Sequence, residues 1–232
     1  MRLALLCALN AELAARRACA LVTPLDGSEA FLFLVGQTTD NILAGAIDEQ
    51  LRTGRSGIAT HNGQRVFINV HTPPVRLIVI GAVHIAQTLA PMARLSGVDV
   101  VVVDPRSAFA AKARFPDTPI LTQWPDEALP ALGLDRFTAL AALTHDPKID
   151  DPALRLALAS ECFYIGALGS KRSHSKRVER LLAGGVASQD LARVHAPIGL
   201  DIGAATSEEI AVAVLGEIIS SLRCKPLLER SA

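Results

Sequence analysis

The sequence predicts an α/β protein in which a doubly wound parallel sheet follows a small α+β domain. From Val75 onward, short apolar segments alternate with segments of helical periodicity, a pattern typical of parallel strands covered by helices. Aromatic residues make up only 4% of the chain, so the core must consist of Ala, Leu, Val and Ile, which suits such a sheet. The pair Pro73-Pro74 separates this region from an N-terminal one without the alternation, and we place the domain boundary there.

The N-terminal domain, residues 1–72, is predicted to combine helices and strands. Asn10 is a suitable N-cap for its first helix, and Asp26-Gly27-Ser28 is typical of a turn between two strands. The sequence does not give the order of the elements in space. The expected elements are a helix over 10–17, strands over 19–22 and 30–35, a helix over 41–51 and a strand over 65–70.

The C-terminal domain, residues 75–232, follows the alternating pattern throughout. Its last helix opens with Thr206 and Glu209, which form the T-x-x-E pattern of a capping box. The expected strands cover residues 77–80, 98–103, 120–121, 137–143 and 163–168. The expected helices cover residues 84–95, 151–160 and 206–223, with a basic helix that ends near residue 182.

The composition argues against several classes of function. The chain has 23 basic and 23 acidic side chains among 232 residues, and this zero net charge argues against a nucleic-acid partner. Its four cysteines form no C-x-x-C pair, which argues against a zinc ribbon or an iron–sulfur cluster. No uncharged apolar stretch approaches about 20 residues, and the apolar start of the chain meets Glu12 and Arg16-Arg17 rather than a cleavage site. We therefore expect a cytoplasmic protein with no membrane partner.

The first predicted strand of the C-terminal domain ends in Gly81-Ala82-Val83-His84-Ile85-Ala86. Against the dinucleotide fingerprint G-x-G-x-x-G/A, this turn keeps the first glycine and the final alanine. It has Val83 at the second position, where a β-branched side chain obstructs a pyrophosphate. Asp104 follows about 20 residues later, at the usual place of a ribose-binding acid. The pattern predicts a Rossmann-like fold and leaves open whether a dinucleotide binds or the pyrophosphate site is impaired.

The tripeptide Thr144-His145-Asp146 comes directly after a predicted strand and is followed by Asp150-Asp151. Ligands of open α/β sheets bind beyond the carboxyl ends of the strands, so His145 could carry a proton, ligate a metal or donate to an anion. In the alternative interpretation, His145 is a structural hydrogen-bonding residue and Asp150 or Asp151 caps the next helix. The residues alone favour this second interpretation.

A glycine-rich turn, Gly166-x-x-Gly169-Ser170-Lys171-Arg172, follows the last predicted strand and opens a basic helix. Exposed amides, the positive end of a helix dipole and nearby cations together favour an anion such as phosphate. The spacing is not that of a P-loop, and a solvated basic helix face is the alternative. The further basic residues of this helix are His174, Lys176, Arg177 and Arg180.

The segment over 196–204, Ala-Pro-Ile-Gly-Leu-Asp-Ile-Gly-Ala, is too regular in glycine and apolar residues for a solvent-exposed loop. Its single carboxylate, Asp201, and its position before the capped helix predict a shaped loop that lines a pocket. A tight crossover packed on the sheet would give the same pattern.

Together these segments resemble the XdhC/CoxI family of xanthine dehydrogenase accessory proteins, which are maturation factors for molybdenum hydroxylases. The combination of T-H-D, Y-I-G-A-L-G-S-K-R and P-I-G-L-D-I-G-A is specific. The chain departs from the family pattern at Val83, where glycine is common, and at Ala46, where longer members carry the cysteine of G-G-C-V-E. The matching stretches cover residues 79–86, 102–106, 115–116, 143–146, 150–154, 164–172, 196–204 and 208–211.

The resemblance implies a chaperone rather than an independent enzyme: any catalysis would be assisted sulfur transfer, and no catalytic residue is assigned. Such a protein binds the molybdenum cofactor, as molybdopterin or as its cytosine dinucleotide, and shields it from water. It presents the cofactor to a cysteine desulfurase for sulfuration and inserts it into an apo molybdenum hydroxylase. The resemblance also implies a homodimer, in keeping with a mean hydropathy of +0.33.

The resemblance also assigns roles to residues of the three turns and of the loop over 196–204. The glycine-rich turn would offer amides and positive charge to the cofactor phosphate, His145 and Asp146 would line the pterin or metal side, and Asp201 would accept from pterin nitrogens. No set of metal ligands is implied. The expected cofactor-binding residues are Gly81, His84, Asp104, His145, Asp146, Gly166, Gly169, Ser170, Lys171, Arg172 and Asp201.

Two alternatives use the same fold. An NAD(P)-dependent oxidoreductase would bind the ribose with Asp104 and use His145 as acid or base, although Val83 and the lack of a second catalytic group argue against it. A regulatory nucleotide-binding module without catalysis is the other, since a Rossmann-like scaffold serves many functions.

Overall fold

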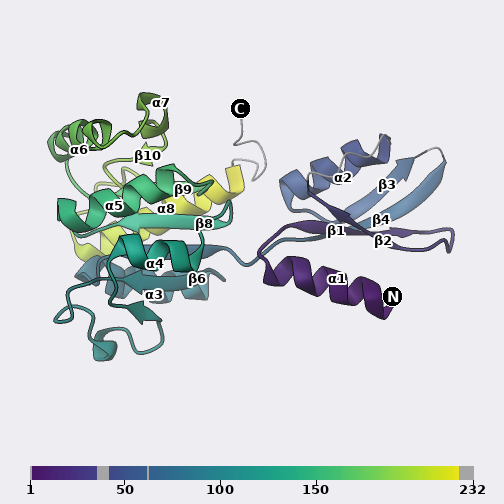
Figure 1. Ribbon diagram of the computed structural model, residues 1–232, viewed down its shortest axis with the longest axis horizontal. Coiled ribbons are helices and arrows are strands. Elements are labelled where there is room, and N and C mark those ends of the chain that lie inside the picture. The colour runs from purple at the N-terminus through teal and green to yellow at the C-terminus, as the bar shows by residue number, and fades with distance from the viewer. Residues whose placement is uncertain (1, 36–41, 62, 225–232) are drawn as a thin grey trace. The chain divides into compact units, whose positions relative to one another are not determined.

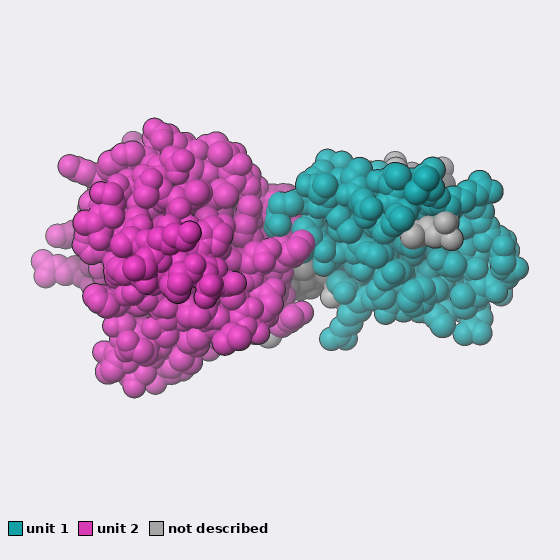
Figure 2. Space-filling view, turned by 90° about the horizontal axis from the view of Figure 1, so that it is seen from below, with its two compact units in different colours: residues 1–73, 226–232 teal, residues 74–225 magenta. Residues whose placement is uncertain are grey.

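The computed structural model describes residues 2–35, 42–61 and 63–224. These residues form two compact units, which meet in the sequence at Pro73 and Pro74 (Figure 2). Each unit has its own sheet and its own buried core. No helix in these ranges is both long and apolar enough to span a bilayer.

The first unit is an antiparallel sheet with a helix packed on each face (Figure 1). The strands lie in the order β2-β1-β4-β3, and the register pairs Val22 with Ile68, both of which are fully buried. Phe33 and Ile47 are buried as well, so strands and helix contribute to one core. The elements are α1 (Leu3–Ala14), β1 (Cys19–Pro24), β2 (Phe31–Leu34), α2 (Ile42–Thr53), β3 (Gly57–His61) and β4 (Gln64–His71).

In the first unit one prediction is wrong and one strand was missed, while the expected strands, the second helix and the turn at Asp26 are confirmed. The first helix begins at Leu3, so Asn10 lies inside it rather than at its N-cap, because the Leu- and Ala-rich start of the chain has high helix propensity. Strand β3, which begins at Gly57, was not predicted. The turn at Asp26 is confirmed, since the Ser28 amide donates to Asp26 Oδ1 at 2.9 Å.

The second unit is a six-stranded parallel sheet in the order β10-β9-β8-β5-β6-β7. This is the doubly wound Rossmann order, with a switch point between β5 and β8, and it confirms the predicted fold class. Every residue of the central strands β5 and β8 is buried, as expected for a sheet covered on both faces. The strands are β5 (Arg76–Ile80), β6 (Asp99–Val103), β7 (Ile120–Leu121), β8 (Thr138–Ala142), β9 (Tyr164–Ala167) and β10 (Val194–His195).

Helices cover both faces of this sheet (Figure 1). Ile78 and Ile80 pack with Leu129 and Leu154 of α4 and α5, while α3 packs against α8. Because alternate residues of a strand face opposite sides, Leu77 and Val79 point away from α4 and α5. The helices are α3 (His84–Leu95), the 3-10 turn η1 (Lys112–Arg114), α4 (Pro125–Leu132), α5 (Pro147–Leu158), α6 (Lys171–Ala183), α7 (Ser188–Leu191) and α8 (Ser207–Cys224).

Most predicted elements of the second unit are confirmed, and α3 has the predicted bounds. The capping box is confirmed too: the Glu209 amide donates to Thr206 Oγ1 at 3.2 Å, and the Thr206 amide donates to Glu209 Oε2 at 3.1 Å. The prediction that Asp150 or Asp151 caps α5 is wrong. The N-cap is Asp146, whose Oδ1 accepts from the Lys148 amide at 2.9 Å. Elements α4, α7 and β10 were not predicted.

The parallel register brings the ends of the strands to one level. Ile80 pairs with Val103 on one side and with Ala142 on the other, and Ala142 pairs with Ala167. The turns that follow β5, β6, β8 and β9 therefore begin side by side along the carboxyl edge, which is where ligands of such sheets bind.

Candidate functional site

At the switch point between β5 and β8, Gly81 of one turn lies close to Thr144 of the other. Gly81 has φ +113°, and a Cβ atom at this position would lie 2.7 Å from Thr144 Cγ2. Only glycine adopts this backbone conformation readily, so it allows the two turns to touch. Gly81, predicted as a ligand-binding residue, thus has a packing role that is visible in the structure.

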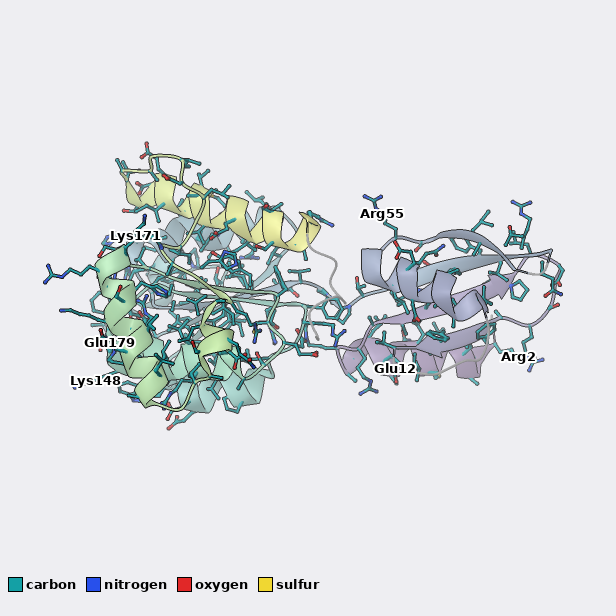
Figure 3. All side chains as sticks on the ribbon, turned by 90° about the horizontal axis from the view of Figure 1, so that it is seen from above. Arg2, Glu12, Arg55, Lys148, Lys171 and Glu179 are labelled. Atoms are coloured by element: carbon teal, nitrogen blue, oxygen red, sulfur yellow. The ribbon has the colours of Figure 1, made fainter. Side chains whose placement is uncertain are left out.

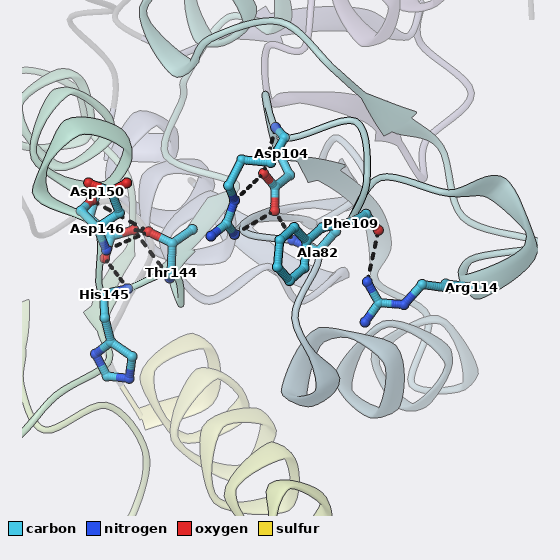
Figure 4. Close-up of polar contacts among 9 residues, drawn as sticks. Ala82, Asp104, Phe109, Arg114, Thr144, His145, Asp146 and Asp150 are labelled. Carbon is cyan, nitrogen blue, oxygen red and sulfur yellow. Dashed lines mark hydrogen bonds and ion pairs between the residues drawn. The ribbon is translucent and has the colours of Figure 1, made fainter.

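Asp104 joins the turns after β5 and β6 (Figure 4). Its side chain is completely buried and accepts from the Ala82 amide at 2.8 Å, from the Arg106 amide at 3.0 Å and from Arg106 Nε and Nη2 at 2.9 and 2.8 Å. Burial alone would raise the pKa of Asp104, but the bonds from Arg106 and Ala82 outweigh it and the pKa is lowered. These four bonds occupy both carboxylate oxygens, so the geometry gives no support to ribose binding by Asp104.

The segment after β6 folds back over this pair. Arg106 Cζ lies 4.4 Å from the ring centroid of Phe109, within the range of a cation–π contact. Arg114 Nη1 donates to the Phe109 carbonyl at 2.9 Å, and its Nη2 donates to Gln87 Oε1 at 3.0 Å. Sequence reasoning missed this arginine–phenylalanine cluster, which fixes the segment against α3.

Asp150 organises the turn after β8 (Figure 4). Its carboxylate is buried and accepts from Thr144 Oγ1 at 2.7 Å and from the His145 amide at 3.0 Å. Burial raises the pKa of Asp150, with these bonds opposing the shift. The arrangement holds His145 at φ +63°, a left-handed conformation in which His is enriched. The His145 ring is exposed and points away from the Asp150 carboxylate.

The turn after β9 approaches His145. Gly169 has φ +134°, and a Cβ atom there would lie 3.8 Å from His145 Nδ1 and 3.8 Å from Arg177 Nη2. Ser170 is the N-cap of α6, with its Oγ accepting from the Ser173 amide at 3.2 Å. The structure therefore brings together His145 and Gly169, which are 24 positions apart, at the start of a basic helix.

Arg177 is the least expected member of this group. It is only 3% exposed, and its Nη2 donates to the Leu168 carbonyl at 2.8 Å. Burial lowers the pKa of Arg177, while the charge of Asp150 opposes the shift. The sequence showed it only as one of several basic residues on a helix, with no local signal that distinguishes it from the exposed ones.

The remaining predicted residues lie at three kinds of position. Lys171 and Arg172 are exposed on the first turn of α6, where Figure 3 labels Lys171. His84 and Asp201 are exposed, at the start of α3 and in the loop before α8. Gly166 is a correction: it lies inside β9 rather than in the turn, and a Cβ atom there would lie 2.6 Å from Ile198 Cδ1. Its missing side chain serves packing.

A second polar cluster, also missed from the sequence, holds the loop after β10. Glu217 of α8 accepts from Tyr164 Oη at 2.6 Å and from the Gly199 amide at 2.8 Å, and its Oε1 lies 2.9 Å from His195 Nδ1. Burial would raise the pKa of Glu217, but these bonds lower it. Burial raises the pKa of Tyr164, and the Glu217 carboxylate adds to the shift. Through the Gly199 amide this cluster holds the loop over 196–204 against α8, and the predicted pocket beside it stays a prediction.

Comparison with known proteins identifies the family. The model of the XdhC Rossmann domain matches residues 77–218. The chain belongs to the XdhC family. The matched range covers β5 through most of α8 and contains His145, Gly169 and Arg177.

Three relatives of this XdhC-family chain are about one-third identical to it over the residues that match. The uncharacterised protein YqeB of Escherichia coli K12 is 33% identical over 174 residues, which are 72% of this chain and 31% of YqeB. A probable xanthine dehydrogenase subunit of Bacillus subtilis 168 is 33% identical over 157 residues, 67% of this chain and 46% of that protein. The molybdenum cofactor insertion chaperone PaoD of E. coli K12 is 31% identical over 150 residues, 64% of this chain and 40% of PaoD.

A solved structure agrees with this assignment. The crystal structure of a xanthine dehydrogenase from Bacillus halodurans superposes with a TM-score of 0.66 at 26% identity, covering 95% of this chain and 64% of that one. The matched part of this chain is less than half of each of the three relatives.

Proposed function

We propose that this chain is a chaperone that binds the molybdenum cofactor and supports maturation of a molybdenum hydroxylase of the xanthine dehydrogenase type. The observation that carries the proposal is the meeting of His145, Gly169 and the basic first turn of α6 at the carboxyl edge of an XdhC Rossmann domain. The kinship with an insertion chaperone and with a probable component of a xanthine dehydrogenase supports it.

The cofactor is cargo here, and its phosphate fits the charges at this edge. Gly169 and Ser170 would offer amides and Lys171 and Arg172 positive charge, since a helix N-terminus favours an anion. The exposed imidazole of His145 lies near Gly169 and would face the pterin or the metal. Asp146 contributes less than expected, because its carboxylate caps α5.

The finer steps of the proposed function are sulfuration and transfer. The chain would present the cofactor, as molybdopterin or its cytosine dinucleotide, to a cysteine desulfurase and then to the apo-hydroxylase. It would do so as a homodimer. Within the described residues no group of His, Cys, Asp and Glu side chains is arranged to hold a metal ion, so the metal would arrive and leave with the pterin.

The test is to express the chain in a host that makes the cofactor and to measure oxidised pterin fluorescence and molybdenum in the denatured protein. Stoichiometric pterin and molybdenum are expected. The double variant K171A/R172A should retain severalfold less, while the control K176A, which removes an exposed lysine from the same helix, should retain the wild-type amount. No pterin after incubation with excess cofactor would overturn the proposal.

A further inference from the structure

The guanidinium of Arg177 has more donors than the described residues accept. A guanidinium carries five N–H groups. Nη2 binds the Leu168 carbonyl, but Nε and Nη1 are buried without a hydrogen-bond partner among the described residues. Unpaired buried donors on a charged group are costly and therefore rare. These unpaired N–H groups indicate that a hydrogen-bond acceptor from outside the chain binds Arg177 in the functional protein.

Asp150 supplies a countercharge for Arg177 but not the missing acceptor. The two groups attract one another, yet the oxygens of Asp150 are bound by Thr144 and by the His145 amide. The buried carboxylate thus stabilises the buried guanidinium through space and leaves its N–H groups unpaired.

The surroundings of the guanidinium suit a small anion. Arg177 points back toward the N-terminus of α6, as long helical side chains do, and reaches the turn that contains Gly169. That turn presents backbone without a Cβ atom, and the helix that follows has 13 residues, long enough to supply a positive N-terminal end. His145 Nδ1 and Arg177 Nη2 each lie 3.8 Å from the Gly169 Cβ position.

We propose that Arg177, the Gly169 turn and the first turn of α6 form a site for a phosphate group, in which Arg177 is the buried cation. The guanidinium fork matches two oxygens of a phosphate, and the exposed Lys171 and Arg172 attract the anion to the edge of the site. The inference rests on the proposed function only for the identity of the natural ligand, the phosphate of the cofactor. The site itself binds inorganic phosphate.

The experiment is a titration of the ¹⁵N-labelled full chain with inorganic phosphate, at neutral pH and with sodium chloride of equal ionic strength as control. Saturable shifts are expected at the amides of Gly169 and Ser170 and at the Nε–H signal of Arg177. The Arg177 signal is read in the wild-type protein, so no variant needs to fold for it to decide. An Arg177 signal unmoved at saturating phosphate overturns the proposal.

Two variants give a second measurement. R177K keeps the charge but loses the fork, and phosphate affinity should fall at least tenfold. R180K is the matched control on the same helix: Arg180 is exposed and pairs with Asp151, so affinity should stay within twofold of wild type. If a folded R177K protein binds phosphate with wild-type affinity, the role of Arg177 is only its hydrogen bond to the Leu168 carbonyl.

Cofactor retention separates this inference from the proposed function. If phosphate binds at Arg177 but the chain never carries pterin, the proposed chaperone function is wrong and the phosphate site stands. If R177K retains as much pterin as wild type and phosphate does not shift the Arg177 signal, the phosphate site is wrong and the proposed function stands.

Discussion

The carboxylate of Asp104 holds the Arg106 guanidinium through two hydrogen bonds, to Nε at 2.9 Å and to Nη2 at 2.8 Å. In a dinucleotide-binding chain, an acid at this place binds ribose hydroxyls. Here the same acid joins the turns that follow two neighbouring strands. The position of Asp104 in the sequence, which is typical of a ribose-binding acid, therefore corresponds here to a structural role.

We predict that the chain does not bind NADH at micromolar concentrations, because Asp104 has no free oxygen and Val83 obstructs the pyrophosphate position. The measurement is the fluorescence of NADH titrated with the protein, with a known NAD-dependent dehydrogenase as positive control. Saturable enhancement at micromolar protein would contradict this and restore the oxidoreductase alternative.

The variant D104N should lower the free energy of unfolding by about 1.5–3 kcal/mol, the range for hydrogen bonds that involve a charged group. The pKa of Asp104 is lowered in the folded protein, so its contribution is present above the unfolded pKa of about 3.9 and is lost as the pH falls through the folded value. Urea unfolding at several pH values measures it. The gap between wild type and D104N should be constant near neutral pH, should begin to narrow near pH 4 and should close only below the folded pKa.

The exposed Asp99, in the same unit, provides the control D99N, which should shift stability by less than about 0.5 kcal/mol. An equal loss in both variants at neutral pH would mean that net charge, rather than the bonds to Arg106, determines the effect.

The variant G81A should destabilise the chain by about 2–4 kcal/mol, because it adds backbone strain of about 1–2 kcal/mol and a close contact with Thr144. G97A is the matched control: Gly97 also has a positive φ, +78°, but open space around its Cβ position, so only the strain should remain. In G81A/T144S the Cγ2 methyl is gone while the hydroxyl that binds Asp150 stays. Urea unfolding should show partial recovery, and no recovery would refute the contact.

Tyr164 and Glu217 should be energetically coupled. Y164F should cost about 1–2 kcal/mol, because it removes the donor of this partly buried hydrogen bond. E217Q should cost a similar amount, because the amide has one acceptor oxygen where the carboxylate uses two. In a double-mutant cycle the two losses should fall short of additivity by at least about 0.5 kcal/mol. Additive losses would show that the cluster is not a unit, and E179Q, an exposed glutamate on α6, is the control.

His145 should matter for the cargo but not for folding. H145N keeps a residue that tolerates the left-handed backbone, so the free energy of unfolding should change by less than about 0.5 kcal/mol, while pterin retention should fall severalfold. H84N is the matched exposed histidine and reports whether the predicted contribution of His84 exists. If H145N retains as much pterin as wild type, His145 does not contribute to cofactor binding.

The sheet of the second unit was predictable because its strands are continuous apolar runs. Leu77 to Ile80 are fully buried, and the valines over 100–103 are buried except for the partly buried Val101, so hydrophobicity alone marks these strands. Strand β10 has two residues, of which only Val194 is apolar, whereas the equally short β7 is the apolar pair Ile120-Leu121 and was predicted. Helix α4 carries Pro130 inside it, a residue that predicts the end of a helix rather than its continuation.

The candidate site was predictable in part. The turns at His145 and Gly169 follow strand ends, and parallel pairing alone places them together. The burial of Arg177 was not predictable, since a basic residue in a basic helix is expected to be exposed. Glu217 was missed for a different reason: its partners, Tyr164, His195 and Gly199, come from separate elements, and no local pattern relates them to α8.

The backbone of His145 has a consequence for affinity. Asp150 fixes that turn through hydrogen bonds to the residues on which ligand contacts would depend, so the left-handed conformation exists before any ligand arrives. The loss of chain entropy needed to shape this part of the surface has already occurred during folding. A ligand that meets His145 therefore binds a preorganised surface, and more of its contact energy remains to hold it.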